Sequence, residues 1–300
     1  MTGAAGFIGR RLVGRLLALG AAVVAADRVE PRQAGGASWL VGDLLDCAHT
    51  HRAMAALQAP RGRRRAVFHL AGQSSRAQAV ADPDGALAQN VVATQRVLEC
   101  CRAAGVSRVL FPSTALVYRE RGPGPITEDD PVGPASIYEA TKLCAEALVA
   151  GYGGAFGFSA DVARVSAAYG PGCRPDTVVG SAVAQARARR SVALRSLAPV
   201  RDFVFVDDVV DTLVGLLCAG HEPGARIFNV CSGVATSVGE MAAELCRIAG
   251  LGPPAETGIP GGCAGPLRIE LSPRRLEART GLGPWTSLSE GLARTLEEQV

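Results

Sequence analysis

The sequence predicts an α/β protein, a doubly wound parallel sheet with a smaller C-terminal α/β lobe. Two observations carry this prediction. Short valine-rich runs alternate with longer segments of helical period, which is typical of strands joined by crossover helices. A glycine-rich turn at the start of the first helical segment is typical of dinucleotide-binding units.

The expected strands are residues 22–26, 39–41, 66–70, 108–112 and 159–165. Apolar residues at helical spacing predict a first helix along Ile8, Leu12 and Leu16 and a long helix from Asp84. Glycine- and proline-rich segments after residue 170 and at 258–265 indicate loops of a second lobe. We therefore assign residues 1–168 to a dinucleotide-binding domain and 169–300 mainly to a substrate-binding lobe, with segments that return to the first sheet.

Composition excludes several classes of protein. The chain has 300 residues, of which 48% are hydrophobic, enough to bury about three quarters of the unfolded surface. Its net charge of +3 is not gathered into a basic stripe with interleaved aromatic residues, so no nucleic-acid partner is expected. No apolar run long enough to span a membrane and no leader segment is visible. We expect a cytoplasmic protein.

Cysteine and histidine usage gives no metal site and no disulfide framework. The nine cysteines include no Cys-x-x-Cys pair. His49 and His51 lie close in sequence, but nothing nearby completes a ligand set. We predict that no metal is bound.

The glycine turn begins at Thr2, with only Met1 before it, so the first strand of the fold is missing from this sequence. We expect that the start was assigned too far downstream. Upstream in-frame codons that encode no short apolar strand would contradict this, and the truncation would then be real.

Gly3, Gly6 and Gly9 form the glycine turn, with Phe7 and Ile8 between the last two glycines, where a helix starts. Such glycines allow a tight turn and a close approach of the backbone to a pyrophosphate, and the helix start offers free N–H groups. A Gly-rich turn also serves as a plain connection. In this context it predicts a Rossmann-type cofactor site.

Acidic residues follow two of the predicted strands. Asp27, with its neighbour Arg28, lies where a carboxylate accepts hydrogen bonds from the ribose of NAD and repels the extra phosphate of NADP. The alternative is a turn residue at a strand end. Asp43 and Leu44 are expected at the adenine end of the cofactor.

Tyr138 and Lys142 lie one helical turn apart and share a helix face. A phenol with a pKa near ~10 is a poor base at neutral pH, but a neighbouring ammonium lowers that pKa. Thr114, after the strand at 108–112, is the expected third member, which relays the proton or holds the substrate hydroxyl. The alternative for Tyr138 and Lys142 is a solvated pair.

Several segments resemble the extended short-chain dehydrogenases/reductases, specifically the nucleotide-sugar epimerases and dehydratases. Besides the glycine turn and the Tyr-Lys pair, these segments are residues 68–72, 90–94, 113–118, 169–172, 201–208 and 286–291. The resemblance implies that Leu70, Ala71, Gly72, Asn90 and Ser113 line the cofactor site, together with Tyr138 and Lys142. It also implies a homodimer joined through the helix from Asp84 and the helix that bears Tyr138.

The resemblance further assigns a substrate site to Ser113, Thr114, Tyr138, Ala167, Arg174, Arg201 and Arg268. Arg201 is expected to hold a phosphate of the sugar nucleotide, because its guanidinium fork suits a diphosphate. Three departures from the family pattern concern these contacts. Ala167 replaces a common Asn, Cys263 stands where a second phosphate-binding arginine is expected, so that Arg268 is only a candidate substitute, and Arg119 replaces a glycine.

Ala115 and Leu116 indicate which reactions are excluded. Relatives that eliminate water or carbon dioxide carry carboxylates at these positions, so we discount dehydratase and decarboxylase. An NAD-dependent 4-epimerase remains, favoured by Asp27. The alternatives are an NAD(P)H-dependent reductase of a keto sugar nucleotide and a non-catalytic dinucleotide-sensing protein, although such proteins usually lose the Tyr-Lys pair.

Arg174 provides the hint to the substrate. Residues 173–176, Cys-Arg-Pro-Asp, resemble a segment of UDP-glucuronate 4-epimerases in which the arginine faces the sugar carboxylate. The alternative is a surface loop residue. We therefore expect UDP-glucuronate as the favoured substrate, converted to UDP-galacturonate, with UDP-glucose as the next choice.

Overall fold

The computed structural model describes residues 1–30, 35–56, 64–120, 122–188, 191–258 and 267–297. The chain divides into two compact units. Unit 1 comprises Met1–Val117, Val132–Arg164 and Leu213–Phe228, and unit 2 comprises Tyr118–Pro131, Val165–Thr212 and Asn229–Val300. The predicted assignment of roles to residues 1–168 and 169–300 stays a prediction.

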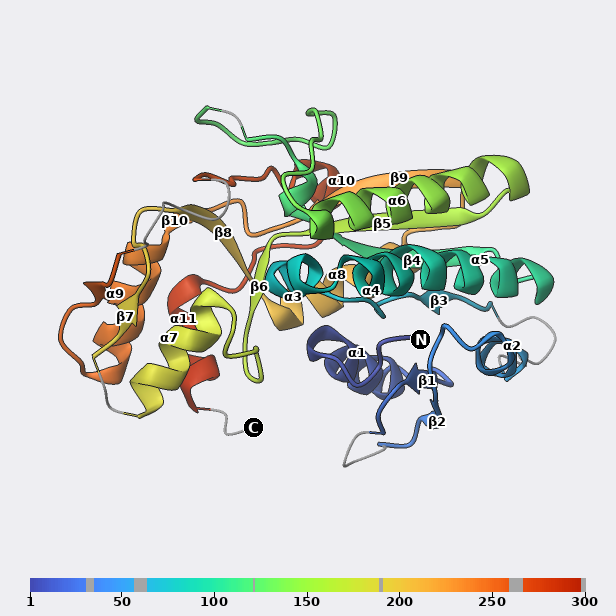
Figure 1. The fold of residues 1–300 in the computed structure, drawn as a ribbon, viewed down its shortest axis with the longest axis horizontal. Coiled ribbons are helices and arrows are strands. Elements are labelled where there is room, and N and C mark those ends of the chain that lie inside the picture. Colours follow the sequence, from blue (N-terminus) through green and yellow to red (C-terminus); the bar gives the residue numbers. More distant parts are fainter. Residues whose placement is uncertain (31–34, 57–63, 121, 189–190, 259–266, 298–300) are drawn as a thin grey trace. The chain divides into compact units, whose positions relative to one another are not determined.

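Unit 1 alternates strands and helices along the chain (Figure 1). Its elements are α1 (Phe7–Ala18), β1 (Val24–Asp27), β2 (Ser38–Val41), α2 (Cys47–Ala55), β3 (Val67–Phe68), α3 (Arg76–Ala81), α4 (Pro83–Leu87), α5 (Ala93–Ala103), β4 (Arg108–Thr114), α6 (Ile137–Phe156) and most of β5 (Ser159–Val165). It also contains the end of α8 (Val206–Cys218) and most of β9 (Gly224–Val230).

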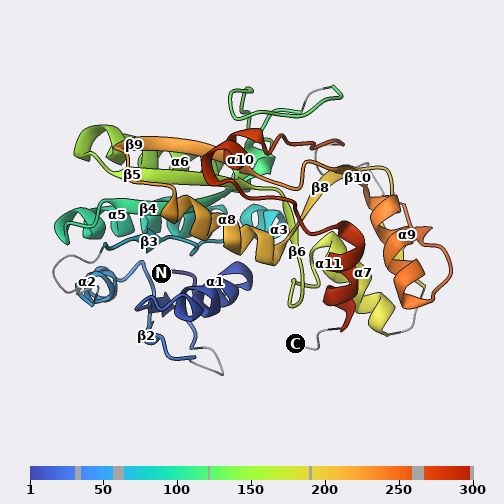
Figure 2. The same ribbon diagram turned by 180° about the vertical axis from the view of Figure 1, so that it is seen from behind.

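Strands β3, β4, β5 and β9 form a sheet in that order, and β1 pairs with β2 in a second sheet. The pairs β1–β2 and β3–β4 are parallel, which confirms the α/β prediction. Helices α5 and α6 cover one face of the four-stranded sheet, and the end of α8 lies on the other (Figures 1 and 2). All five predicted strands are present within a few residues of their predicted ends.

Met1 and Thr2 lie between β1 and β3. Thr2 makes parallel bridges to Ala26 and to His69, and its backbone N–H and carbonyl bond with Phe68 and Leu70. The ammonium group of Met1 donates to the Val24 carbonyl at 2.6 Å. One residue, Thr2, thus bridges both neighbouring segments at the place of the missing first strand, and its backbone N–H and carbonyl are both hydrogen-bonded.

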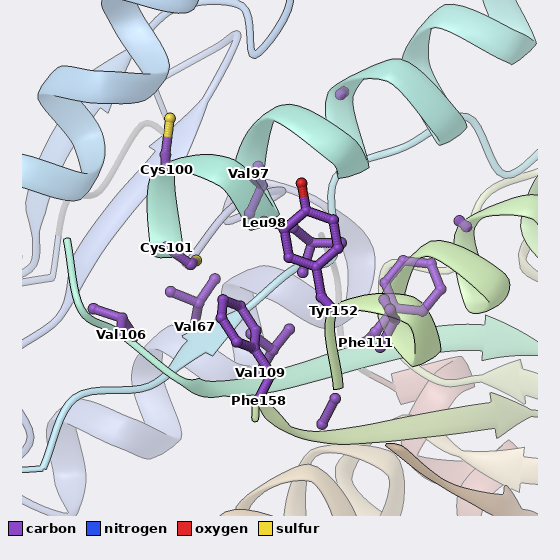
Figure 3. Close-up of a cluster of buried hydrophobic side chains, with 14 of the residues drawn as sticks. Val67, Val97, Leu98, Cys100, Cys101, Val106, Val109, Phe111, Tyr152 and Phe158 are labelled. Atoms are coloured by element: carbon purple, nitrogen blue, oxygen red, sulfur yellow. The ribbon is translucent and has the colours of Figure 1, made fainter. Parts of the chain in front are cut away.

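The core of unit 1 lies between the sheet and helices α5 and α6. Val67, Val109 and Phe111 from the strands meet Leu98 of α5 and Tyr152 of α6 (Figure 3). Cys100 and Cys101 belong to the same cluster, so these two thiols act as small core residues. This packing fixes β4 against α6, the two elements that carry the predicted catalytic residues.

The helix predicted from Asp84 is not one uniform α-helix. It consists of α4, a π-helical turn over Ala88–Val92 and α5. Asn90 lies within the π-helical turn and is buried. Such a turn re-aims side chains relative to a regular helix and is frequent at functional sites.

Unit 2 contains two small sheets and five helical elements or parts of them among its described residues. These are β6 (Ala167–Tyr169), α7 (Val178–Arg187), β7 (Ala193–Leu194), β8 (Val200–Phe205), the first half of α8, β10 (Ala235–Ser237), α9 (Val238–Ala249), β11 (Ala255–Glu256), α10 (Arg274–Thr280) and α11 (Leu288–Glu297). The sheet orders are β10-β8-β6 and β11-β7. Its core gathers Phe203 and Phe205 of β8 against Met241 and Leu245 of α9.

Candidate cofactor and catalytic site

The glycine turn admits no side chains at two of its positions. Gly3 has a φ of +69°, and a Cβ there would lie 2.5 Å from the backbone nitrogen of Ala71. A Cβ on Gly9 would overlap the carbonyl oxygen of Gly3. Close packing of the turn against α1 and the segment after β3 therefore requires glycine.

The start of α1 is free of side-chain caps. Gly6 is the N-cap, no side chain accepts from the first turn, and that turn carries no acidic residue. Phe7 and Ile8 are half-buried first residues of this twelve-residue helix. Backbone N–H groups at an uncapped helix start bind phosphate, so the turn fits the pyrophosphate of a dinucleotide.

Asp27 ends β1 and ties the glycine turn to it. Its Oδ2 accepts from the N–H of Ala5 at 2.9 Å, and its Oδ1 accepts from the N–H of Arg28 at 2.7 Å. A carboxylate has about four lone-pair sites, so acceptor capacity for ribose hydroxyls remains. The Arg28 side chain is exposed.

Asp43 and Leu44 follow β2. Asp43 is exposed and accepts from the N–H of Leu45 at 2.8 Å, whereas Leu44 is buried and its carbonyl accepts from Thr50. His49 is buried and His51 bonds to the Cys47 carbonyl. No group of three possible metal ligands occurs among the described residues.

Leu70, Ala71 and Gly72 lead out of the sheet after β3, where a chain of buried polar groups supports them. His69 hydrogen-bonds with Thr2 at 2.7 Å and with Thr94 at 3.0 Å. Burial lowers the pKa of His69 to about 3, so the ring is neutral. The neutral ring of His69, hydrogen-bonded to two hydroxyls, holds Thr2 and Thr94 in place on either side of it.

Asn90 clamps the loop after β3 to α6. Its Oδ1 accepts from the N–H of Gln73 at 2.8 Å, and its amide donates to Thr141 Oγ1 at 2.9 Å. Thr141 donates in turn to the carbonyl of Tyr138 at 2.8 Å. Asn90 therefore uses its polar groups within the protein, which indicates that it positions the loop. Sequence reasoning missed Gln73 and Thr141, although Thr141 lies three residues after Tyr138 on the same helix.

Tyr138 and Lys142 lie on α6, and Ser113 and Thr114 end the contacting strand β4. Tyr138 is buried in a cluster with Ala79 and Ala86. The Ser113 hydroxyl is buried and has no hydrogen-bond partner in the part of the chain that the structure describes. A buried hydroxyl with no partner is costly unless a ligand satisfies it.

Lys142 is held above the end of β4. Its Nζ donates to the Pro112 carbonyl at 2.8 Å and lies 4.2 Å from the centre of the Phe111 ring. Burial lowers the pKa of Lys142 to about 8, an effect that Glu146 partly opposes. The arrangement places a cation beside β4 on the same helix face as a phenol, which can favour the phenolate.

The predicted substrate residues outside the 113–114 pair and Tyr138 belong to unit 2. Ala167 opens β6, and Arg201 lies in β8 with its Nη1 on the Val200 carbonyl at 2.8 Å. Arg268 lies on the segment that bridges Val200 and pairs with Glu270 at 2.6 Å, so Arg201 and Arg268 come from adjoining segments. Cys263 lies outside the described residues.

Arg174 makes a local ion pair. Both ends of its guanidinium fork bond with Asp176, Nε to Oδ1 at 2.9 Å and Nη2 to Oδ2. The hydrogen bond from Arg174 lowers the pKa of Asp176. The fork is thus shaped for a carboxylate, and at present the carboxylate it binds comes from the same loop.

Comparisons with known proteins agree with the predicted family of the chain. A family model described as "NAD dependent epimerase/dehydratase family" matches residues 1–231. The UDP-glucose 4-epimerase of Mycolicibacterium smegmatis is 33% identical, over 99% of this chain and 96% of the relative. A probable UDP-glucuronate 4-epimerase of Rhizobium meliloti is 27% identical, over 99% of this chain and 95% of the relative.

A solved structure described as MoeE5 in complex with UDP-glucuronic acid and NAD is 32% identical to the chain. It superposes with a TM-score of 0.87 over 99% of this chain and 96% of that one. A second structure of MoeE5 contains UDP-glucose and NAD and superposes with a TM-score of 0.86. Among the described residues, no helix combines the length and apolar character needed to cross a bilayer.

Proposed function

The chain belongs to the NAD dependent epimerase/dehydratase family, and we propose that it epimerises carbon 4 of UDP-glucuronate in preference to UDP-glucose. The family prediction, the enzyme class and the cofactor are confirmed: the chain is an NAD-dependent nucleotide-sugar epimerase, since relatives that match over nearly its whole length include UDP-glucose and UDP-glucuronate 4-epimerases and similar structures contain NAD. The preference for the uronate is the proposal.

The proposed NAD site is built by unit 1. The uncapped start of α1 would hold the pyrophosphate, Asp27 would accept from the ribose, and Asp43 with Leu44 would line the adenine site. Leu70, Ala71, Gly72 and Ser113 complete the lining, while Asn90 fixes the loop that carries them. Bound here, NAD would supply a hydride acceptor, and in reduced form a hydride donor, for carbon 4 of the sugar.

The proposed proton path uses three side chains of unit 1. The Tyr138 Oη removes the proton of the 4-hydroxyl and later returns it. Lys142 stabilises the phenolate and holds its ammonium on the Pro112 carbonyl, next to the end of β4. Thr114, and the unpartnered hydroxyl of Ser113, hold the reacting hydroxyl of the sugar. The single observation that carries the proposed epimerase chemistry is the buried lysine on the face of α6 that also bears Tyr138.

The proposed contacts of the nucleotide sugar come from unit 2. Arg201 and Arg268, on adjoining segments, bind the diphosphate through their guanidinium forks. Arg174 exchanges Asp176 for the carboxylate of the uronate, which keeps its fork paired. Holding that carboxylate also restrains the labile keto acid from losing carbon dioxide.

We also propose that the enzyme is a cytoplasmic homodimer. Apolar side chains on the candidate helices are exposed in the single chain, at Leu87 (49%), Ile137 (42%) and Phe156 (51%). These residues lie on or beside the helices through which relatives associate by the resemblance. Their exposure on these helices supports an interface with a second copy of the chain.

The test is to incubate the purified chain with UDP-glucuronate and, separately, with UDP-glucose, and to separate the products. We expect conversion of both to the galacto epimer, faster for the uronate, with no net consumption of NADH or NADPH. No conversion of either sugar would overturn the proposed function. Stoichiometric consumption of a reduced cofactor would assign the chain to the reductases instead.

A further inference from the structure

Glu139, directly after Tyr138 in α6, is a completely buried carboxylate. Its Oε1 pairs with the guanidinium of Arg76, the first residue of α3. Its Oε2 accepts from the N–H of Ala135 at 2.9 Å, in the segment that leads into α6. A buried carboxylate is tolerated only when it is paired and hydrogen-bonded, and both oxygens of Glu139 are.

The helix that supplies Arg76 also covers Tyr138. Ala79 lies three residues after Arg76, on the same face of α3, is fully buried, and shares a cluster with Tyr138. A six-residue helix has little stability of its own, so its contacts determine its position. One face of α3 therefore contacts two neighbouring residues of α6. Arg76 forms an ion pair with Glu139, and Ala79 packs in the cluster of Tyr138.

We propose that the Arg76–Glu139 ion pair positions Tyr138, by fixing α3 against the phenol and by cancelling a buried negative charge one residue away from it. This inference rests on the proposed role of Tyr138 as the base. Arg76 and Glu139 act through Tyr138 and are not themselves catalytic residues. Neither was a candidate in the sequence, because their pairing joins segments that are far apart along the chain.

The charge argument follows from the charged groups on the elements that pack around the start of α6. These are Arg76 on α3, Asp82 and Asp84 at the start of α4, and Glu139, Lys142 and Glu146 on α6, while His69 beside Lys142 is neutral. The charged residues Glu99 and Arg102 of α5 meet Tyr152 and Phe156, at the other end of α6. With Arg76 removed, Glu139 opposes ionisation of the phenol and works against Lys142.

Arg76→Met is the first variant. We expect kcat to fall about tenfold with KM within about threefold, and the acid limb of the kcat profile to move up by about one pH unit. The neutral double variant Arg76→Met with Glu139→Gln removes both charges, so its acid limb should return to within about 0.3 of the wild type. A pair with only a structural role would lower the melting temperature and leave the limb in place.

Glu139→Gln alone is the second variant, should Arg76→Met fail to fold. The amide keeps the size of the side chain and leaves Arg76 as an uncancelled cation. We expect the acid limb to move down by about half a pH unit, opposite in direction to the first variant. An unmoved limb in this variant would overturn the inference.

Arg108→Met is the matched control, because Arg108 belongs to another buried ion pair of unit 1. Its carboxylate partner Asp161 keeps Arg226 at 2.8 Å after the substitution. Arg108 opens β4, at the opposite end of the strand from Thr114. We expect a lower melting temperature with an unmoved acid limb.

Ultraviolet titration of the phenol in the purified protein, with Tyr138→Phe subtracted as the blank, gives the same answer without turnover. The titration midpoint of Tyr138 should rise in Arg76→Met, fall in Glu139→Gln and stay at its wild-type value in Arg108→Met. If wild-type protein converts neither sugar, the proposed function fails and this titration still decides the inference. Equal midpoints in all variants would overturn it.

Discussion

Lys142 of unit 1 and Arg174 of unit 2 are both cations with proposed ligand contacts, but the protein holds them differently. Lys142 is 9% exposed and donates to the backbone of β4, a distant segment of the sequence. The Arg174 side chain is 41% exposed and binds Asp176, two residues away. The lysine is thus fixed by the tertiary core, and the arginine by its own loop.

This difference separates the groups proposed for the chemistry of the reaction from the group proposed for the choice of sugar. Lys142 and Thr141, on the same helix as Tyr138, are buried and hydrogen-bonded to the protein, so they are preorganised. The arginine pairs of unit 2 cost little to exchange, because exposed ion pairs contribute only about 0–1 kcal/mol. We therefore expect changes in unit 1 to affect turnover or folding, and changes at Arg174 to affect substrate preference.

Tyr138→Phe is expected to have the largest effect. It removes the phenol hydroxyl while the ring still packs on Ala79 and Ala86. Turnover should fall at least about a hundredfold for both sugars, the range for loss of a general base. Steady-state rates with UDP-glucuronate and UDP-glucose measure this, and melting temperature checks the fold. Unchanged turnover would remove Tyr138 from the mechanism.

Gly9→Ala tests the glycine turn, with Gly14→Ala on the same helix as its control. The new Cβ at residue 9 would overlap the Gly3 carbonyl, whereas at residue 14 it meets nothing within 4 Å. We expect Gly9→Ala to lose its bound NAD and to melt earlier. Gly14→Ala should keep its NAD and gain up to about 1 kcal/mol of stability. The dinucleotide released on denaturation, measured by absorbance, distinguishes them; equal release would contradict the proposed pyrophosphate site.

Lys142→Met is expected to stabilise the protein freed of NAD while impairing turnover. Burial lowers the pKa of Lys142 from 10.5 to about 8, so at neutral pH folding carries a charged group that the interior disfavours. Below pH 8 this penalty is present in full, and it disappears as the pH rises from about 8 toward 10.5. The gain from methionine should be roughly 1–3 kcal/mol at pH 7 and shrink over that window.

Urea unfolding of wild type and Lys142→Met at pH 7 and at pH 10 measures this difference. A variant that is less stable than the wild type at pH 7 would show that the Pro112 hydrogen bond outweighs the burial of the charge.

Arg174→Ala should have the smallest effect on turnover and the most selective effect on affinity. We expect the KM for UDP-glucuronate to rise about tenfold, and the KM for UDP-glucose to stay within about twofold, as for loss of a charge-assisted fork. Asp176→Asn, which weakens the competing carboxylate, should lower the KM for the uronate a few-fold. Equal losses for both sugars in Arg174→Ala would exclude it from the carboxylate site.

The sequence predicted the strands of unit 1 well because each is a short valine-rich run bounded by helical segments. The Ser159–Val165 strand matched at both ends. In unit 2, β8 was not predicted, since Arg201 and Asp202 interrupt its apolar pattern. Asp202 is buried there and accepts from Ser232 and Gly233, partners that only the folded chain provides. The π-helical turn at Asn90 likewise has no signature in the spacing of apolar residues.

The candidate site divides in the same way. The sequence predicted the glycine turn, Asp27, Tyr138 and Lys142, because these residues belong to motifs with short, recognisable spacing. Gln73, Glu139 and Arg76 were missed because their partners are distant along the chain. Arg174 and Asp176 lie in one short sequence segment, but only the structure shows that the guanidinium of Arg174 is hydrogen-bonded to the Asp176 carboxylate. The roles of all these residues remain predictions for the variants above.

The most direct test follows a deuterium label at carbon 4 of UDP-glucuronate through the reaction, with no reduced cofactor added. The account predicts that UDP-galacturonate forms and keeps the label at carbon 4, because the hydride leaves and returns within one site. A galacto product that has exchanged its label with solvent, or no product at all, would contradict it.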